Sequence, residues 1–231
     1  MKYQKTILIT LLTAIALPLS ANVDIASLIK RTEEGEIKAQ ILLAEEYYFG
    51  EYIKQDYTKA FELFSEAAKE DDAKAQYWLG ELYLAGHGVK KDDIKAFKLF
   101  QKSALQGNSD GQYLLSYMYG EGKGTKKDEF NEYLWMKKSA MQGDPLAQFG
   151  LSTLYLGNST IKRDTERVFY WCQLAAKQGY VDAEFQLGGI YYSGMGVEKD
   201  IDKAIKWCEK AAHKGHQEAQ QMIKFLKSKK Q

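Results

Sequence analysis

Apolar residues recur along most of this chain at the spacing of a helix, and the pattern itself repeats every 36 residues. A small residue marks the same point in each period, and these markers are Ala39, Ala75, Gly111, Ala147, Ala183 and Ala219. In the second unit, Leu79 and Tyr83 follow Ala75 by four and eight positions, so the three side chains share one face of a helix. The regular spacing predicts an array of tandem helical units.

Each unit is predicted to fold as two helices joined by a tight turn. In the second unit the first helix covers about residues 73–84, and Gly86 and Gly88 allow the positive φ angles of the turn. An aspartate that can cap the second helix recurs in each unit, at Asp56, Asp92, Asp128, Asp164 and Asp200. A glycine follows the second helix in four units and suits its C-terminal cap.

Unusual residues at a few points predict local differences in packing. Gly80 and Gly188 stand in the middle of first helices, where close approach by a neighbouring helix would explain the missing side chain. In the fourth unit Asn158 replaces a turn glycine, and we expect it to adopt the left-handed conformation that asparagine tolerates. In the third unit Glu132 stands where three other units carry alanine, so we expect looser helix packing there.

The repeated pattern resembles the Sel-one-like repeat, a branch of the tetratricopeptide superfamily. The resemblance is clearest in residues 75–107 and 183–215, which both begin A-x-x-x-L-G-x-x-Y and continue with a G-x-G-V turn. It implies an all-α fold, a right-handed α-solenoid of five 36-residue helix-turn-helix repeats that serves as a scaffold for protein partners. The repeats then occupy residues 35–218, between an N-terminal capping helix at 22–34 and a C-terminal capping helix and tail at 219–231.

Residues 1–21 have the layout of a secretory signal peptide. Lys2 and Lys5 precede an apolar run over residues 6–17, and Ala21 offers a small residue for cleavage. The run is too short to cross a membrane as a helix. We therefore expect cleavage near Ala21, a periplasmic or secreted protein, and no membrane insertion of the mature chain.

Composition narrows the classes of partner. The chain has 32 Lys and Arg residues against 31 Asp and Glu, so its charge gives no reason to expect a nucleic-acid partner. Aromatic residues make up 13% of the chain, which argues against disorder, and only 2 prolines favour a helical protein. Phosphate-binding glycine loops and other cofactor motifs do not occur, so we expect no cofactor.

The two cysteines, Cys172 and Cys208, are predicted to be free buried thiols. They occupy equivalent positions one period apart, where Phe64, Phe100 and Met136 stand in the other units. Stacked helices place equivalent positions about 8–10 Å apart, whereas a disulfide needs Cα atoms within about 7 Å. Some secreted relatives carry cysteine pairs inside each repeat, and this sequence lacks them.

Candidate catalytic and metal-binding patterns are weak. His213 and His216 have H-x-x-H spacing, but a helix C-terminus explains a cation there and a third ligand is not evident. Ser27-x-x-Lys30 and Ser159-x-x-Lys162 have the spacing of a serine–lysine pair, without the companion motifs of such enzymes. We expect neither a metal site nor catalysis.

The binding surface is predicted on the concave face, which the first helix of each unit lines. The positions three, six and ten residues after each marker vary between units and therefore carry individual chemistry. In the first three units they combine an apolar strip with an acidic edge: Leu42, Glu45, Phe49, Trp78, Glu81, Leu114, Tyr117 and Glu121. The alternative is that superhelical neighbours or the N-terminal cap cover this strip. The recurring aromatic residues two positions after the marker, Tyr77 and Tyr113 among them, are interpreted as packing.

Together these features predict a non-enzymatic, exported scaffold that binds a protein or peptide partner. A partner segment with an apolar anchor and basic residues would suit the strip. A second interpretation is a periplasmic inhibitor or immunity protein that neutralises a toxin enzyme, as some secreted members of the family do. A hydrolase of the β-lactamase type is the least favoured alternative.

Overall fold

A computed structural model describes residues 24–229, which form twelve helices and no strand. The predicted signal peptide lies outside these residues. The helices are α2 (Ile25–Glu33), α3 (Ile37–Phe49), α4 (Tyr57–Lys69), α5 (Ala73–Ala85), α6 (Asp93–Leu105), α7 (Ser109–Glu121), α8 (Glu129–Met141), α9 (Pro145–Leu154), α10 (Thr165–Lys177), α11 (Val181–Ser193), α12 (Ile201–His213) and α13 (Gln217–Lys229).

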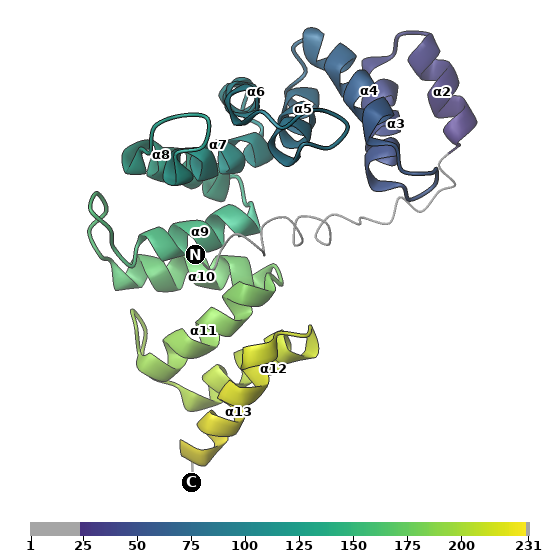
Figure 1. Cartoon of the computed structure of the whole chain (residues 1–231). Helices are drawn as coiled ribbons and strands as arrows, with labels where there is room; N and C mark the ends of the chain where they lie inside the picture. Colours follow the sequence, from purple (N-terminus) through teal and green to yellow (C-terminus); the bar gives the residue numbers. More distant parts are fainter. Residues whose placement is uncertain (1–23, 230–231) are drawn as a thin grey trace.

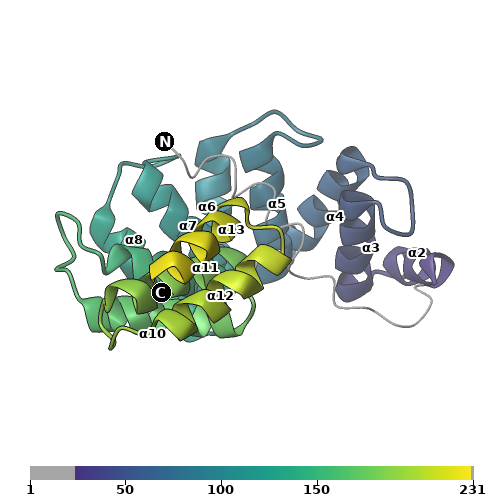
Figure 2. The same ribbon diagram turned by 90° about the horizontal axis from the view of Figure 1, so that it is seen from below.

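Each helix packs against its neighbours in sequence, which gives a stack of helical hairpins. The stack curves in an arc from α2 to α13 (Figure 1), and the view from below in Figure 2 places α2 at one end. The predicted all-α solenoid of five repeats is thus confirmed. Among residues 24–229, no helix has the length and apolar character needed to cross a membrane.

The aspartate of each turn closes its hairpin in two ways. The side chain of Asp92 accepts hydrogen bonds from the amides of Ile94 and Lys95, and so caps α6 as predicted. The backbone amide of Asp92 donates to the carbonyl of Tyr83 at 2.9 Å, which ties the turn back to α5. The same backbone bond joins aspartate and tyrosine in the other four units: Asp56 to Tyr47, Asp128 to Tyr119, Asp164 to Tyr155 and Asp200 to Tyr191.

Glycines in mid-helix allow the close approach that their sequence predicts. A Cβ atom added to Gly80 of α5 would lie 2.7 Å from Cε1 of Phe100 on α6. At Gly188 of α11 it would lie 2.4 Å from Sγ of Cys208 on α12. The partner side chain comes from the same repeat position in both cases, so the two helices of a hairpin meet at a small residue facing a larger one.

The third and fourth units correct two of the expectations. Asn158 does not adopt the predicted left-handed conformation. The preceding residue, Gly157, has the positive φ of this turn (φ 101). The Asn158 side chain accepts hydrogen bonds from the amides of Thr160 and Ile161 and shapes the turn that way. In the third unit the side chain of Glu132 packs against Gly120. A Cβ atom added to Gly120 would lie 2.6 Å from Oε1 of Glu132. The glycine thus compensates for the larger residue.

A polar pair that the sequence reading did not predict links the start and the end of each of the last four hairpins. In three units it joins two glutamines, and Nε2 of Gln106 lies 2.9 Å from Oε1 of Gln76. The other two pairs are Gln142 with Gln112 and Gln178 with Gln148. In the fifth unit an ion pair replaces the amides, with Nζ of Lys214 2.7 Å from Oε1 of Glu184.

Cys172 and Cys208 are both buried and free in the structure. Each is fully covered within the main hydrophobic core. Burial raises the pKa of the Cys172 thiol to about 12 and that of the Cys208 thiol to about 11, so both are protonated near neutral pH.

Candidate partner-binding face

The predicted strip begins on α3 with two exposed apolar side chains. Leu42 is 37% exposed and Phe49 is 40% exposed, which is unusual for large apolar residues of a helix. The ring of Trp78 on α5 extends this surface, because its centroid lies 5.4 Å from that of Phe49. Tyr48 packs between them, 5.0 Å from Phe49 and 4.9 Å from Trp78. The two helices therefore present one connected apolar surface.

Glu45 holds the indole of Trp78 in place. Oε1 of Glu45 accepts a hydrogen bond of 2.8 Å from Nε1 of Trp78 and lies 2.6 Å from Nζ of Lys74. The ring of Trp78 also stacks on Phe64, a buried residue of α4. Glu45 is therefore a positioning residue for the aromatic surface, and its charge is already partnered.

The strip does not continue as predicted at Leu114. This side chain is 1% exposed and belongs to the main core, so it cannot contact a partner, and the prediction was wrong for this residue. The physical reason is the curvature of the stack, because α5 and α7 contact each other directly. A side chain directed at the neighbouring inner helix is covered there.

Tyr117 and Glu121 lie further along α7. Tyr117 is half-buried, and its hydroxyl lies 2.6 Å from Nζ of Lys123, which also sits 4.8 Å from the centre of its ring. Glu121 is exposed at the end of the helix. These residues form a polar part of the inner face that is separate from the apolar surface on α3 and α5.

Glu81, a predicted binding residue, belongs to a group of tyrosines and carboxylates on the inner helices whose other members were not predicted as a site. The charge of Asp110 on α7 acts on Glu81 of α5 and on Asp144 before α9. Burial, followed by the charge of Asp110, raises the pKa of Glu81 to about 7. Burial is the main cause that raises the pKa of Asp144 to about 6, against the hydrogen bond that its carboxylate accepts from the amide of Ala147.

Tyr77 and Tyr113 border these carboxylates. Their rings fill the recurrent aromatic position and pack in the core, as the sequence predicts. Burial and then the charge of Glu81 raise the pKa of Tyr77, while burial and the charge of Asp144 raise that of Tyr113. One sequence difference could have revealed the group. The second and third units carry tyrosine at this repeat position, whereas the fourth and fifth carry Phe149 and Phe185, which have no hydroxyl.

Two of the other candidate residues, Ser159 and His216, have partners in the structure. Oγ of Ser159 lies in an exposed turn and donates a hydrogen bond to the carboxylate of Glu129. His216 stacks on Phe185 with ring centres 4.2 Å apart. Within residues 24–229, no three His, Cys, Asp or Glu side chains are grouped as a metal site would require.

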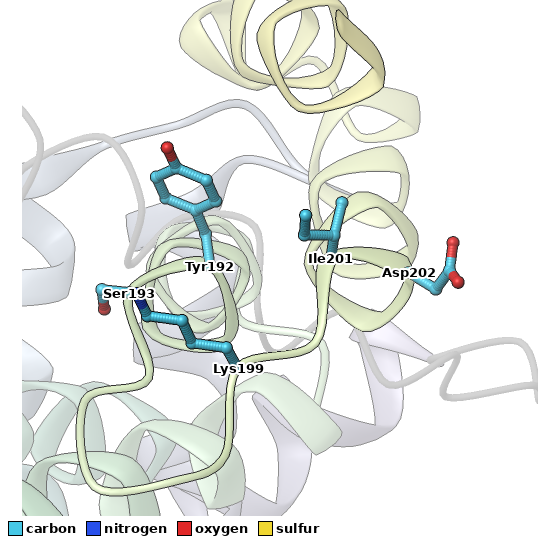
Figure 3. Close-up of a pocket in the computed structure, with 5 residues that line it drawn as sticks. All are labelled: Tyr192, Ser193, Lys199, Ile201 and Asp202. Carbon is cyan, nitrogen blue, oxygen red and sulfur yellow. The ribbon is translucent and has the colours of Figure 1, made fainter. Parts of the chain in front are cut away.

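A shallow depression lies between the end of α11 and the start of α12 (Figure 3). Its lining residues are Tyr192, Ser193, Lys199, Ile201 and Asp202. Tyr192 and Ile201 point to one side of the ribbon, whereas Asp202 points away from them. The polar groups thus do not converge on one point, and the depression lacks the arrangement of a small-molecule site.

The comparison with protein families matches every repeat. The sequence profile of the Sel1 repeat covers residues 37–72, 73–108, 109–144, 145–180 and 181–216. No curated protein matches the chain at the level of sequence.

Solved structures show the same fold. A Sel1 repeat protein from Oxalobacter formigenes is 33% identical with a TM-score of 0.82, over 87% of this chain and 58% of its own. A protective antigen of uropathogenic Escherichia coli is 34% identical with a TM-score of 0.79, over 87% of this chain and 43% of its own. An immunity protein from Pseudomonas aeruginosa is 25% identical with a TM-score of 0.51, over 76% of this chain and 66% of its own. The chain thus spans less than two thirds of the length of the first two.

Proposed function

Because this chain belongs to the Sel1 repeat family, whose repeats mediate contacts between proteins, we propose that it is an exported, non-catalytic scaffold that binds a protein or peptide partner on the inner face of α3 and α5. The observation that carries the proposal is the connected apolar surface of Leu42, Tyr48, Phe49 and Trp78, which we call the aromatic patch.

The aromatic patch has the chemistry of an interface anchor. Aromatic side chains contribute most to binding when they sit in an ordered, well-packed setting. The hydrogen bond from Trp78 to Glu45 and the stack on Phe64 order the indole before a partner arrives. Binding therefore immobilises few additional side chains, and this lowers its entropic cost.

Export is supported by the sequence of residues 1–21, with its two lysines, its apolar run and Ala21. A non-catalytic role is supported by the family's scaffold character and by the contacts of Ser159, which bonds to Glu129.

The second candidate function is a periplasmic inhibitor or immunity protein that neutralises a toxin enzyme. It is favoured by the 25% identity to the Pseudomonas aeruginosa immunity protein. A toxin whose active-site rim carries an apolar residue would fit the aromatic patch. Co-expression of the chain with any toxin enzyme that a neighbouring gene encodes tests this role, since an immunity protein restores growth and a general scaffold does not.

The binding surface is tested by a double truncation. The purified protein captures its partner, mass spectrometry identifies it, and calorimetry measures its affinity. We expect Leu42→Ala/Phe49→Ala to weaken binding by about thirtyfold, because loss of an interface anchor costs about 2 kcal/mol. Both side chains are exposed, so the helical circular dichroism should remain unchanged.

A matched control removes equally exposed apolar groups elsewhere. Leu105 of α6 is 70% exposed and Met141 of α8 is 69% exposed, and both lie at the ends of second helices. Leu105→Ala/Met141→Ala should leave the affinity as it is. Equal losses in the two double variants would refute binding at the aromatic patch.

A further inference from the structure

Two tyrosines of the inner face have polar groups without a partner. Tyr77 is 4% exposed and Tyr113 is 8% exposed, yet neither hydroxyl makes a hydrogen bond within the described residues. Neither oxygen is among the fully buried atoms without a partner, so each keeps some contact with solvent. The rings are fixed in the core while the hydroxyl tips remain free to bind, and a buried polar group usually finds a partner.

Carboxylates lie one helical turn from these tyrosines: Glu81 follows Tyr77 on α5, and Asp110 precedes Tyr113 on α7, which contacts α5. Glu81, Asp110 and Asp144 come from three successive hairpins. In addition to burial, the charges of all three raise the pKa of Tyr77. Glu81 and Asp110 make no hydrogen bond or ion pair within residues 24–229, and Asp144 uses one oxygen to cap α9. We call these five residues the tyrosine–carboxylate cluster.

The cations near the cluster are already engaged. Lys74 lowers the pKa of Asp110 by its charge, but its Nζ is paired with Glu45 at 2.6 Å. Lys123 lies over the ring of Tyr117 and bonds to its hydroxyl. The other titratable groups that act on members of the cluster, or are acted on by them, are Tyr48 of α3, Tyr117 of α7 and Tyr180 just before α11. These groups add no positive charge, so the cluster has an excess of hydrogen-bond acceptors.

We propose that the tyrosine–carboxylate cluster is a subsite that binds the guanidinium of an arginine on the partner, an inference that rests on the proposed function. The acceptors come from three helical hairpins and outnumber the three donors of a lysine ammonium. A guanidinium has five donors in one plane and is weakly hydrated, so it satisfies several acceptors on a partly buried surface at lower cost. An extended partner segment would then anchor an apolar residue on the aromatic patch and place its arginine on α5 and α7.

The test uses N-acetyl-arginine amide as a probe, followed by NMR of the isotope-labelled protein. We expect weak binding, on the order of 1 mM, with shifts that centre on Tyr77, Tyr113 and Asp110. The neutral isostere N-acetyl-citrulline amide should not bind, and the lysine derivative should bind more weakly than the arginine derivative. Equal binding of the citrulline derivative, or shifts that centre elsewhere, would overturn the proposal.

Isosteric variants show whether the carboxylates are responsible. Asp110→Asn/Asp144→Asn removes two charges and keeps the cap of α9, because asparagine is also a good capping residue. We expect it to weaken probe binding by about tenfold. Glu62→Gln/Glu66→Gln removes two charges from exposed positions of α4 and should leave the affinity unchanged. Similar losses of probe affinity in the two double variants would indicate general charge attraction and contradict the subsite.

The pH dependence gives an independent readout. The carboxylates bind a cation only when they are ionised, and the pKa values are about 7 for Glu81 and about 6 for Asp144. Probe binding should therefore strengthen as the pH rises through these values. Glu81→Gln/Asp144→Asn should flatten the profile, and an unchanged profile would contradict the assignment.

The same variants separate this subsite from the proposed function. If Leu42→Ala/Phe49→Ala weakens partner binding as expected while Asp110→Asn/Asp144→Asn leaves both partner and probe affinity unchanged, the scaffold function holds and the arginine subsite fails. If Leu42→Ala/Phe49→Ala leaves partner affinity unchanged but the arginine probe still binds the cluster, the subsite holds and the proposed binding surface fails.

Discussion

The ion pair of the fifth hairpin allows a quantitative test of how these repeats hold together. Glu184 is 3% exposed, and its Oε2 atom has no partner. Its Oε1 atom lies 2.7 Å from Nζ of Lys214, which also donates to the carbonyl of Gly179 at 2.9 Å. Lys214→Met keeps much of the side-chain length but removes the charge and the donor. It leaves a buried carboxylate without compensation.

The expected loss follows from the distance and the exposure. Two unit charges separated by 2.7 Å attract each other by about 6 kcal/mol at an effective dielectric constant of about 20, and by about 1.5 kcal/mol in water. The Lys214 side chain is 43% exposed, so water screens part of its attraction to Glu184. Breaking a fully buried pair costs about 3–5 kcal/mol, and we expect Lys214→Met to lower the free energy of unfolding by about 2–3 kcal/mol.

The other hairpins supply a matched control. Glu184→Gln/Lys214→Gln recreates the amide pair of the fourth unit, where Nε2 of Gln178 lies 2.9 Å from Oε1 of Gln148. This variant should lie within about 1 kcal/mol of the natural protein, because a buried ion pair and a neutral replacement are often of similar stability.

Urea unfolding followed by circular dichroism measures the free energy, and hydrogen exchange locates the loss. Stability in repeat proteins is close to a sum over units and neighbouring interfaces, so α11–α13 should lose protection first. A loss below about 0.5 kcal/mol in Lys214→Met, or an equal loss in both variants, would refute the reasoning.

Two further predictions concern the turns and caps of the hairpins. Gly196→Ala should lower the free energy of unfolding by about 2–3 kcal/mol, measured by urea unfolding, because φ is +71° and the new Cβ would lie 2.0 Å from the carbonyl oxygen of Thr165. Gly35→Ala meets no atom within 4 Å and should show only the cost of its positive φ, about 1–2 kcal/mol, so equal losses would argue against the steric contact. The second prediction concerns Asp200, whose pKa is lowered by the hydrogen bonds that it accepts from Lys203. Its stabilising effect is present above its unfolded pKa and is lost as the pH falls through its folded pKa, so Asp200→Asn should reduce the acid sensitivity of unfolding, and an unchanged pH profile would contradict this.

The fold could be predicted from the sequence because its determinants are local and repeated. Asp92 caps its helix as its position indicates, and Gly80 faces Phe100 as a small mid-helix residue predicts. Each such feature occurs several times at a constant spacing, so one unit supports the interpretation of the next. The prediction for Asn158 was wrong because a turn can form in two ways. Here Gly157 provides the positive φ, and the Asn158 side chain accepts a hydrogen bond from the amide of Thr160.

The candidate site was harder to predict because it depends on curvature. The sequence assigns Leu114 to the inner face, and only the direct contact between α5 and α7 buries it. The tyrosine–carboxylate cluster depends on the same curvature, since Asp144 acts on Tyr77 although it stands at the end of the next repeat along the chain. A repeat pattern specifies the face of a helix, whereas the angle between successive hairpins decides which faces meet.

The polar pair inside each hairpin also bears on how such an array can change in length. Both partners, such as Gln76 and Gln106 or Glu184 and Lys214, fall within one matched repeat. Duplication or loss of a whole repeat therefore carries both partners together. A genetic crossover in the middle of a hairpin could instead join Glu184 to a glutamine and leave a buried charge. The pair thus favours gain and loss of intact units over exchange of single helices.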